Sequence, residues 1–494
     1  MNRHDQQKPS VIIIGTGFGG IGMAIQLKRA GFNEVTLLEK ADRVGGTWRD
    51  NTYPGAACDV QSHLYSYSFE PKHDWTRKFG AQPEIQSYME HCVEKYGLAS
   101  HIRFNQAVSD ASFDSQTNQW TVRTEAGDTY TASVLITATG QLNRPAIPDI
   151  PGLESFKGAM FHSARWDHDY DLTGKRVAVI GTGASAIQFV PAIVPKAAKL
   201  DLYQRSAAWV LPKPDREFTH TEQSLFQKLP LWDRLYRSMI YMKNETRAIA
   251  FTRFNKLLDI FAQQAIKEAR THVTDPEKLK DIIPEYQIGC KRILISNDWY
   301  PAINQPHVDL ITDSIARVDE TGVVTADGER RDADAIIFAT GFRASEFLSP
   351  LRITGREGVS LNDAWANGAK AFKGITVSGF PNLFMVYGPN TNLAHNSILY
   401  MLESQFRYVI SALNALAKYP GAAMDVRQDR QTRYCQVVQR GLDGTVWDTG
   451  CSSWYLDAQG RNTVNWPGFT FSYRFATRAV DTADYTFSDP EITR

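Results

Sequence analysis

An apolar strand, a glycine-rich turn and a helix follow one another twice in this chain. The first strand, over residues 11–14, leads into a turn whose small residues are Gly15, Gly17 and Gly20. The second strand, over residues 177–180, leads into a turn whose small residues are Gly181, Gly183 and Ser185. Such units build parallel sheets covered by helices. The sequence therefore predicts an α/β protein with two Rossmann-like dinucleotide-binding domains.

The residue at the end of the next strand differs in charge between the two units. It is Glu39 in the first unit and Arg205 in the second. The free N–H groups of a glycine turn bind a pyrophosphate, and the residue ending the next strand contacts the ribose. A carboxylate repels a 2′-phosphate, whereas a guanidinium pairs with it. Glu39 therefore predicts a nucleotide with a free 2′-hydroxyl, and Arg205 predicts NADP.

Each unit has a later segment in which a polar hairpin precedes an apolar strand ending in Ala-Thr-Gly, at Gly140 and at Gly341. Residues 213–289 lack strand alternation and predict a helical insertion. An apolar strand before Gly388 and a long helix after it are expected to complete the first sheet. We expect a first domain over 1–145 and 373–494, a second over 146–212 and 290–372, and the helical insertion over 213–289.

Leucine, methionine and aromatic residues recur at helical spacing between Leu229 and Leu258, inside the predicted insertion. We expect these side chains to pack against the neighbouring domain. Lining a substrate entrance is the alternative, because methionine adapts to varied ligands.

Composition narrows the classes of partner. Lys plus Arg equals Asp plus Glu, at 54 each, so no basic field indicates nucleic-acid binding. No apolar run approaches the roughly 18 residues that span a bilayer, and the polar start lacks a signal-peptide pattern, so no stable membrane insertion is expected.

The five cysteines are scattered without a CxxC pair, which predicts no metal centre and favours a reduced cytoplasm. The sequence leaves monomer and dimer open.

A longer motif stands just before the second glycine turn, and its specified residues are Phe156, Gly158, His162, Trp166 and Asp167. They match the pattern FxGxxxHxxxW(P/D), and the chain here resembles the type I Baeyer-Villiger monooxygenases. A second signature of that family is also present, in residues 46–48, residues 53–55 and Asp59. The resemblance extends from the first strand to about Phe475.

This resemblance implies FAD in the first domain and NADPH in the second. Reduced flavin then combines with O2, and a C4a-peroxyflavin inserts one oxygen atom beside the carbonyl of a ketone, giving an ester or lactone. Thr47, Trp48 and Asp59 are implied to lie at the FAD. His162, with the rest of its motif, is implied to couple domain movement to cofactor chemistry.

Oxygen insertion needs a permanent cation near the flavin, and arginine keeps its charge at working pH. The resemblance places this cation at Arg292, with Asp59 as the carboxylate that orients it. It also implies that Lys291 binds the 2′-phosphate together with Arg205 and Ser206. Trp454, in the loop from residue 451 to 456, is implied to contact NADP through its indole.

Three other functions share parts of this pattern. A flavin-containing monooxygenase that oxidises nitrogen or sulfur has a related motif without the Trp-Asp ending seen at Trp166 and Asp167. Disulfide reductases need paired cysteines near the first ribose-contacting strand, where this chain has none. A non-catalytic flavoprotein is distinguished by experiment, because it would not consume NADPH in response to a ketone.

Overall fold

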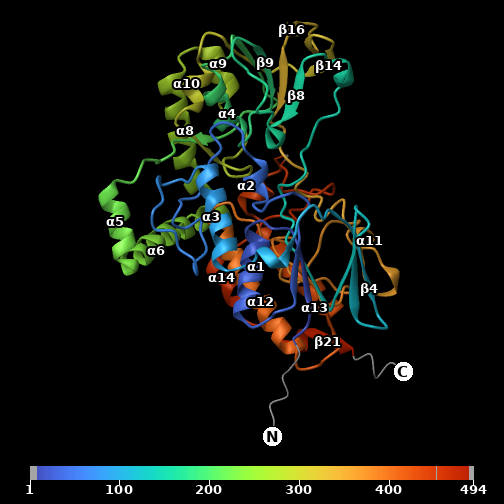
Figure 1. Ribbon diagram of the computed structural model, residues 1–494. Coiled ribbons are helices and arrows are strands. Elements are labelled where there is room, and N and C mark those ends of the chain that lie inside the picture. Colours follow the sequence, from blue (N-terminus) through green and yellow to red (C-terminus); the bar gives the residue numbers. More distant parts are fainter. Residues whose placement is uncertain (1–7, 452, 489–494) are drawn as a thin grey trace.

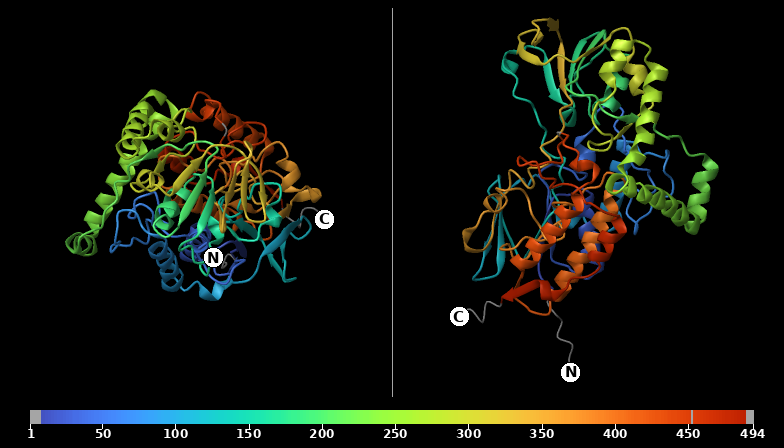
Figure 2. Two further views of the ribbon diagram at one scale, coloured as in Figure 1. Left: turned by 90° about the horizontal axis from the view of Figure 1, so that it is seen from above. Right: turned by 180° about the vertical axis from the view of Figure 1, so that it is seen from behind.

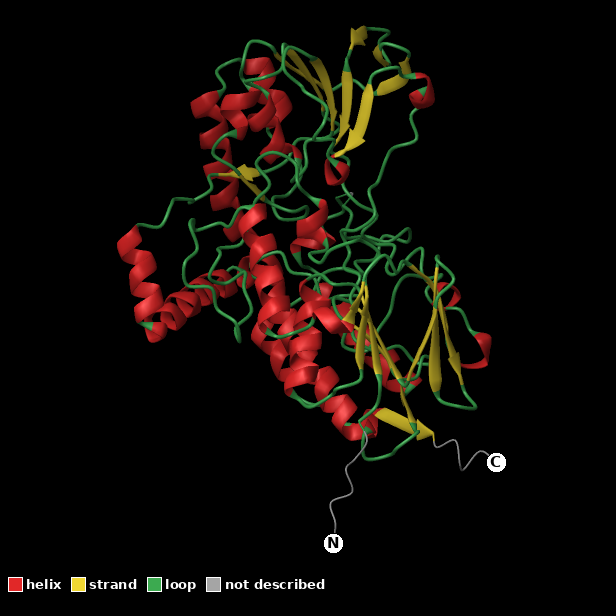
Figure 3. Cartoon of the chain, in the orientation of Figure 1, coloured by secondary structure: helices red, strands yellow, loops and turns green. Residues whose placement is uncertain are grey.

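The computed structural model describes residues 8–451 and 453–488. Two five-stranded sheets lie in separate parts of the molecule, each with helices on one face and a small sheet on the other (Figures 1 and 3). The α/β class and the two Rossmann-like domains predicted from the sequence are therefore confirmed.

The first sheet has the order β19-β7-β1-β2-β3, and all its neighbours are parallel. Its strands are β1 (Val11–Ile14), β2 (Val35–Leu38), β3 (Ile102–Arg103), β7 (Val134–Thr137) and β19 (Leu383–Met385). The pairing of β19 with β7 shows that the chain returns to the first sheet after forming the second, as the apolar strand before Gly388 predicted.

Residues of β1 alternate between two hydrophobic cores, because successive side chains of a strand point to opposite faces. Val11 and Ile13 pack with the helices α1 (Phe18–Arg29), α3 (Gln82–Lys95) and α12 (Ile398–Leu416). Ile12 and Ile14 pack on the other face against the small sheet β18-β4-β5-β6. This burial on both faces explains why the strand is a continuous apolar run.

The small sheet corrects one predicted domain boundary. Its strands are β4 (Val108–Asp114), β5 (Gln119–Thr124), β6 (Thr129–Ala132) and β18 (Arg352–Thr354). Because β18 pairs with β4, the chain rejoins the first domain by Arg352, earlier than the boundary expected at 372/373. A strand of three residues is too short to be found from its sequence pattern.

The second sheet repeats this plan in the order β13-β10-β9-β17-β8, again fully parallel. Its strands are β8 (Ala159–His162), β9 (Arg176–Ile180), β10 (Lys199–Tyr203), β13 (Val308–Ile311) and β17 (Ala335–Phe338). One face packs on α4 (Ala186–Ile193) and α10 (Trp299–Ile303). The other face packs on the hairpin sheet of β14 (Ile315–Asp319), β15 (Gly322–Thr325) and β16 (Arg330–Asp332).

The predicted insertion is helical, with α5 (His220–Lys228), α6 (Pro230–Thr246), α7 (Ala248–Thr252), α8 (Leu258–His272) and α9 (Pro276–Ile282). Its two ends are joined by the parallel pair β11 (Val210–Leu211) and β12 (Leu294–Ile295). Helices α5 and α6 project from the side of the molecule, as Figure 2 shows from behind. The expectation that the apolar side chains here pack against the neighbouring domain is wrong for Leu231, Leu235 and Met239, which are 70%, 50% and 53% exposed.

The remaining elements complete the first domain and its connections. They are α2 (Thr47–Asp50), α11 (Leu361–Ala364), α13 (Gln428–Leu442), α14 (Thr470–Ala476), β20 (Ala423–Val426) and β21 (Tyr485–Ser488). Among the residues described, no helix has the length and apolar character needed to cross a membrane.

Candidate active site

The first glycine turn is tight against the protein and open on its outer side. Gly15 has φ +102°, and a Cβ added there would lie 2.7 Å from the carbonyl oxygen of Ala138. At Gly20 an added Cβ would lie 1.9 Å from the carbonyl oxygen of Gly15. At Gly17 the nearest heavy atom would be 3.9 Å away. Since no side chain caps the start of α1, its first N–H groups can donate hydrogen bonds to an anion such as a pyrophosphate.

The second turn has the same geometry. Gly181 has φ +105°, with the carbonyl oxygen of Ala339 2.7 Å from an added Cβ, whereas Gly183 has only a contact at 3.9 Å. Ala138 and Ala339 begin the two Ala-Thr-Gly endings noted in the sequence. Ser185 is the N-cap residue of α4, and its side chain makes no capping hydrogen bond. Both turns therefore have the shape that a dinucleotide requires.

Glu39 is buried at the end of β2 and receives four hydrogen bonds. Oε2 accepts from the backbone N and the hydroxyl of Thr16, at 3.0 and 2.6 Å. Oε1 accepts from the backbone N of Ala41 at 3.0 Å and from the guanidinium of Arg49 at 2.7 Å. These donors occupy the acceptor positions of a carboxylate. Contact with ribose hydroxyls would therefore require a side-chain donor, Thr16 or Arg49, to give way.

Thr47 and Trp48 begin α2, directly beside the first glycine turn. The backbone N of Gly45 donates to the carbonyl oxygen of Thr16 at 3.1 Å, which fixes the start of this helix against the turn. The indole of Trp48 donates to the hydroxyl of Tyr65 at 3.1 Å. The structure thus places Thr47 and Trp48 beside the first glycine turn.

Arg205, Ser206 and Lys291 gather at the end of β10. Lys291 Nζ lies 3.3 Å from Ser206 Oγ and 4.5 Å from the centre of the Tyr286 ring. Burial lowers the pKa of Lys291, and the charge of Arg205 lowers it further. Within residues 8–451 and 453–488, neither cation forms an ion pair with a carboxylate. Two adjacent unpaired cations fit a site for a phosphate.

Arg292 and Asp59 form a partly exposed ion pair. Arg292 Nε donates to Asp59 Oδ2 at 3.1 Å, and a second guanidinium nitrogen donates to the same oxygen. Burial opposes ionisation of Asp59, but the charge and hydrogen bond of Arg292 outweigh it and hold the pKa of Asp59 below its ordinary value. The charge of Asp59 in turn raises the pKa of Arg292. The two side chains keep 35% and 32% of their surface accessible, so a ligand can contact them.

Two tyrosines beside this pair were not identified from the sequence. Burial raises the pKa of both Tyr387 and Tyr455, and the nearby charge of Arg292 opposes that rise. Tyr387 donates to Asn392 Oδ1 at 2.7 Å. The hydroxyl of Tyr455 is buried and finds no hydrogen-bond partner among the residues described. Burial raises its pKa to about 12, so it remains a proton donor at neutral pH.

The loop that carries Tyr455 is tied to the Arg292 segment by a disulfide between Cys290 and Cys451. Their Cα atoms are 6.4 Å apart, and 161 residues separate them in the chain. The scattered cysteines favoured a reduced environment, and the structure differs for this pair, whereas Cys58, Cys92 and Cys435 are free. Trp454 lies in the same loop with its ring 4.4 Å from that of Tyr455. No spacing rule connects cysteines this far apart in sequence.

The motif before the second glycine turn makes structural contacts. An added Cβ at Gly158 would lie 2.5 Å from the carbonyl oxygen of Asp334 and 2.6 Å from the Phe156 ring, so glycine is required there. Trp166 packs on Phe161 and on Phe189 of α4. Asp167 is exposed and accepts from the backbone N of Asp169 at 3.0 Å.

His162 joins the end of β8 to the strand-end segment after β17. Its Nδ1 accepts from the backbone N of Ala164 at 3.1 Å, so Nε2, 3.0 Å from the carbonyl oxygen of Gly341, is the donor. Burial lowers the pKa of His162, although the hydrogen bond to Gly341 opposes this, and the ring is therefore neutral. The histidine thus lies between the chain entering the second domain and the Ala-Thr-Gly ending that leaves it.

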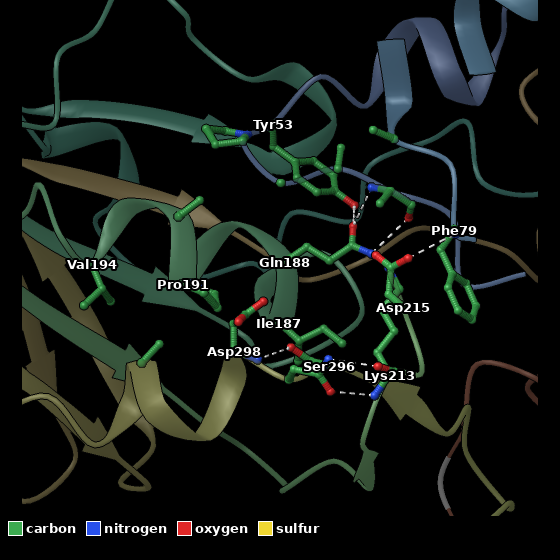
Figure 4. A pocket seen from close by; sticks show the side chains of 18 of the residues that line it. Tyr53, Phe79, Ile187, Gln188, Pro191, Val194, Lys213, Asp215, Ser296 and Asp298 are labelled. Atoms are coloured by element: carbon green, nitrogen blue, oxygen red, sulfur yellow. Dashed lines mark hydrogen bonds between the residues drawn. The ribbon is translucent and has the colours of Figure 1, made fainter. Parts of the chain in front are cut away.

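A pocket of about 1060 Å³ opens beside the site, between α4 and the loop after α2 (Figure 4). Tyr53 donates to Gln188 Oε1 at 2.9 Å across it, and Asp215 accepts from the backbone N of Phe79 at 3.3 Å. Its lining contains neither glycine turn nor Arg292. Lys213, on its wall, is close enough for its charge to lower the pKa of Asp59, so the pocket borders the ion pair. No group of three or more possible metal ligands occurs in the described part of the chain.

Comparison with known proteins identifies the family. The model of the flavin-binding monooxygenase-like family matches residues 8–352. The chain is 47% identical to a Baeyer-Villiger monooxygenase of Pseudomonas aeruginosa, covering 96% of this chain and 90% of that protein. It is 45% identical to a Baeyer-Villiger monooxygenase of Streptomyces coelicolor, covering 99% and 95%.

Solved structures of other monooxygenases have the same fold as this chain. A closed structure of cyclohexanone monooxygenase superposes with a TM-score of 0.88 at 25% identity, covering 97% of this chain and 99% of that one. Oxidised steroid monooxygenase bound to NADP superposes with a TM-score of 0.87 at 30% identity, with the same coverage. None of these relatives supports the nitrogen- or sulfur-oxidising alternative. The chain therefore belongs to the flavin-binding monooxygenase-like family and, within it, to the Baeyer-Villiger monooxygenases, which use FAD and NADPH.

Proposed function

We propose that oxygen insertion takes place at the ion pair of Arg292 and Asp59, where a ketone is converted to an ester or lactone. The observation that carries this proposal is a permanently charged guanidinium, oriented by a carboxylate and accessible over about a third of its surface. Bound FAD, reduced by NADPH, activates O2 so that one oxygen atom enters the product and the other leaves as water.

Arg292 stabilises the negative charge that develops on the ketone oxygen during insertion. A cation held in place by a carboxylate does this without reorganising at the moment of reaction. Asp59 is a positioning residue, because its hydrogen bonds with Arg292 set the direction of the guanidinium. The phenol of Tyr455 adds a hydrogen-bond donor that no protein group among the described residues uses.

The two glycine turns would hold the cofactors. FAD would be held by Gly15, Gly17, Gly20, Glu39, Thr47 and Trp48. NADPH would be held by Gly181, Gly183, Ser185, Arg205, Ser206, Lys291 and Trp454. The motif from Phe156 to Asp167 would couple the two domains through His162, which hydrogen-bonds both to its own segment and to Gly341.

Oxygen-isotope labelling tests this function. The purified yellow enzyme is supplied with NADPH and 18O2 together with linear, cyclic or aryl ketones, and the products are identified by mass spectrometry. We expect ketone-dependent NADPH oxidation and an ester or lactone with one labelled oxygen. Oxidation of NADPH that no ketone stimulates, with sulfide or amine substrates giving the labelled product instead, would contradict the proposal.

A further inference from the structure

Helix α6 has its polar and apolar faces reversed relative to an ordinary surface helix. Its buried residues are Asp233, Ile240, Asn244 and Glu245. Its outward residues include Leu231, Leu235, Met239 and Met242, which are 70%, 50%, 53% and 57% exposed. The outward positions recur at intervals of four, four and three residues, so they form one stripe along the helix. A surface helix normally buries such a stripe.

The buried polar residues fix this orientation. Asp233 Oδ1 lies 3.4 Å from His63 Nε2, and Oδ2 lies 3.3 Å from His73 Nδ1. The Asp233 side chain keeps only 4% of its surface exposed, so turning the helix would break these close contacts with both histidines. Helix α6 therefore cannot turn its apolar stripe inward on this part of its length.

The other end of the helix is held in the same way. Glu245 accepts hydrogen bonds from Asn396 Nδ2 at 2.6 Å and from Thr470 Oγ1 at 2.8 Å. The hydroxyl of Tyr241 lies 2.9 Å from the same Thr470 Oγ1. Because both ends are anchored, the outward stripe is a permanent feature of the surface.

Helix α5 extends this surface, since Leu225 and the connecting Leu229 are 39% and 51% exposed. We call the exposed apolar residues of α5, α6 and their connection the apolar arm, and they are Leu225, Leu229, Leu231, Trp232, Leu235, Met239 and Met242. The arm projects from the body of the molecule in Figure 1 and in both views of Figure 2. Contiguous exposed apolar side chains mark interaction sites.

The charge around the apolar arm is positive. Lys228, Arg234 and Lys243 are exposed beside it and form no ion pair within the described residues. The carboxylates of this segment are engaged elsewhere, since Asp233 and Glu245 are buried and Glu222 pairs with Arg216 at 2.6 Å. The whole chain has no net charge, so the positive charge beside the apolar arm is a local excess.

We propose that the apolar arm docks the enzyme on an anionic lipid surface. Apolar side chains including a tryptophan, flanked by lysine and arginine on a projecting helix, are the features by which amphipathic helices lie in the boundary between headgroups and acyl chains. The flanking cations complement anionic headgroups. A second copy of this chain fits less well, because a twofold contact between two such arms would bring like charges together. One consequence rests on the proposed function: the docked enzyme would reach apolar ketones dissolved in the bilayer.

Vesicle sedimentation with the full-length, FAD-loaded enzyme tests this proposal without measuring turnover. We expect binding to vesicles made of equal parts phosphatidylcholine and phosphatidylglycerol, weaker binding to phosphatidylcholine alone, and loss of the difference at high salt. Leu235→Glu combined with Met239→Glu should weaken binding to the mixed vesicles by at least about tenfold. Val437→Glu is the matched control, because Val437 is 57% exposed on α13, away from the arm.

A second variant separates the contributions of charge and apolar surface. Lys228→Gln combined with Arg234→Gln and Lys243→Gln should abolish the preference for phosphatidylglycerol while keeping the weaker binding to phosphatidylcholine. Flavin absorbance and thermal unfolding show that each variant is folded. The proposal is overturned if the wild type does not sediment with mixed vesicles, or if the Leu235→Glu, Met239→Glu variant still does. It is also overturned if light scattering finds a dimer that this double variant converts to monomer, since the arm would then cover a second copy.

Discussion

Replacement of Arg205 by alanine should change the choice of coenzyme. Arg205 is exposed beside Lys291, and its charge lowers the pKa of that lysine, so the two cations act on the same small volume. A hydrogen bond to a charged group contributes about 1.5–3 kcal/mol. Because Arg205 is exposed to solvent, we take the lower end of this range, which corresponds to roughly a tenfold rise in KM for NADPH.

The assay compares NADPH with NADH, which lacks the 2′-phosphate. The KM for NADH should change little in Arg205→Ala, because that coenzyme offers no group for the guanidinium to pair with. Arg317→Ala is a suitable control, since Arg317 is an exposed arginine of β14, away from the second glycine turn. Equal increases in KM for both coenzymes would refute this assignment of the 2′-phosphate site.

Three further substitutions test other parts of the site. Gly17→Val should fold but purify without FAD, since an added Cβ makes only an ordinary contact with Gly46, at 3.9 Å, yet occupies the approach of the pyrophosphate; normal flavin absorbance would contradict this. Asp59→Asn leaves Arg292 unpaired and should lower the free energy of unfolding. Because the pKa of Asp59 is depressed in the folded state, that loss should be full above about pH 4 and disappear as the pH falls below it; a difference independent of pH would argue against the ion pair. Cys451→Ser should lower the free energy of unfolding by about 2–4 kcal/mol, and a dithiol reductant should reproduce the effect in the wild type but not in the variant.

The sheets and turns were predictable because their signals are local. Val11 to Ile14 is a continuous apolar run, and the glycines after it are required by positive φ and by close carbonyl oxygens. The same holds for the turn at Gly181. The pairing of Arg292 with Asp59 followed from the family resemblance, and the structure brings the two side chains together.

Other features depend on contacts between distant parts of the chain. The three residues of β18 carry no recognisable pattern, and only their pairing with β4 assigns them to the first domain. Cys290 and Cys451 are separated by 161 residues, so their proximity is a product of the fold. Periodicity correctly predicted a helix at α6 but not the direction of its apolar stripe, because buried Asp233 and Glu245 determine which side faces inward.

The central claim is that Arg292 stabilises the developing charge during oxygen insertion. The most direct measurement is the amount of ester formed per NADPH oxidised by the Arg292→Ala enzyme, with hydrogen peroxide measured in parallel. Removing a preorganised stabiliser of developing charge costs a factor of about 100 to 1000 in rate. We therefore predict a flavin-loaded variant that still oxidises NADPH but releases hydrogen peroxide in place of ester. Near wild-type yields of ester per NADPH would contradict the account and show that the stabilising cation is another residue.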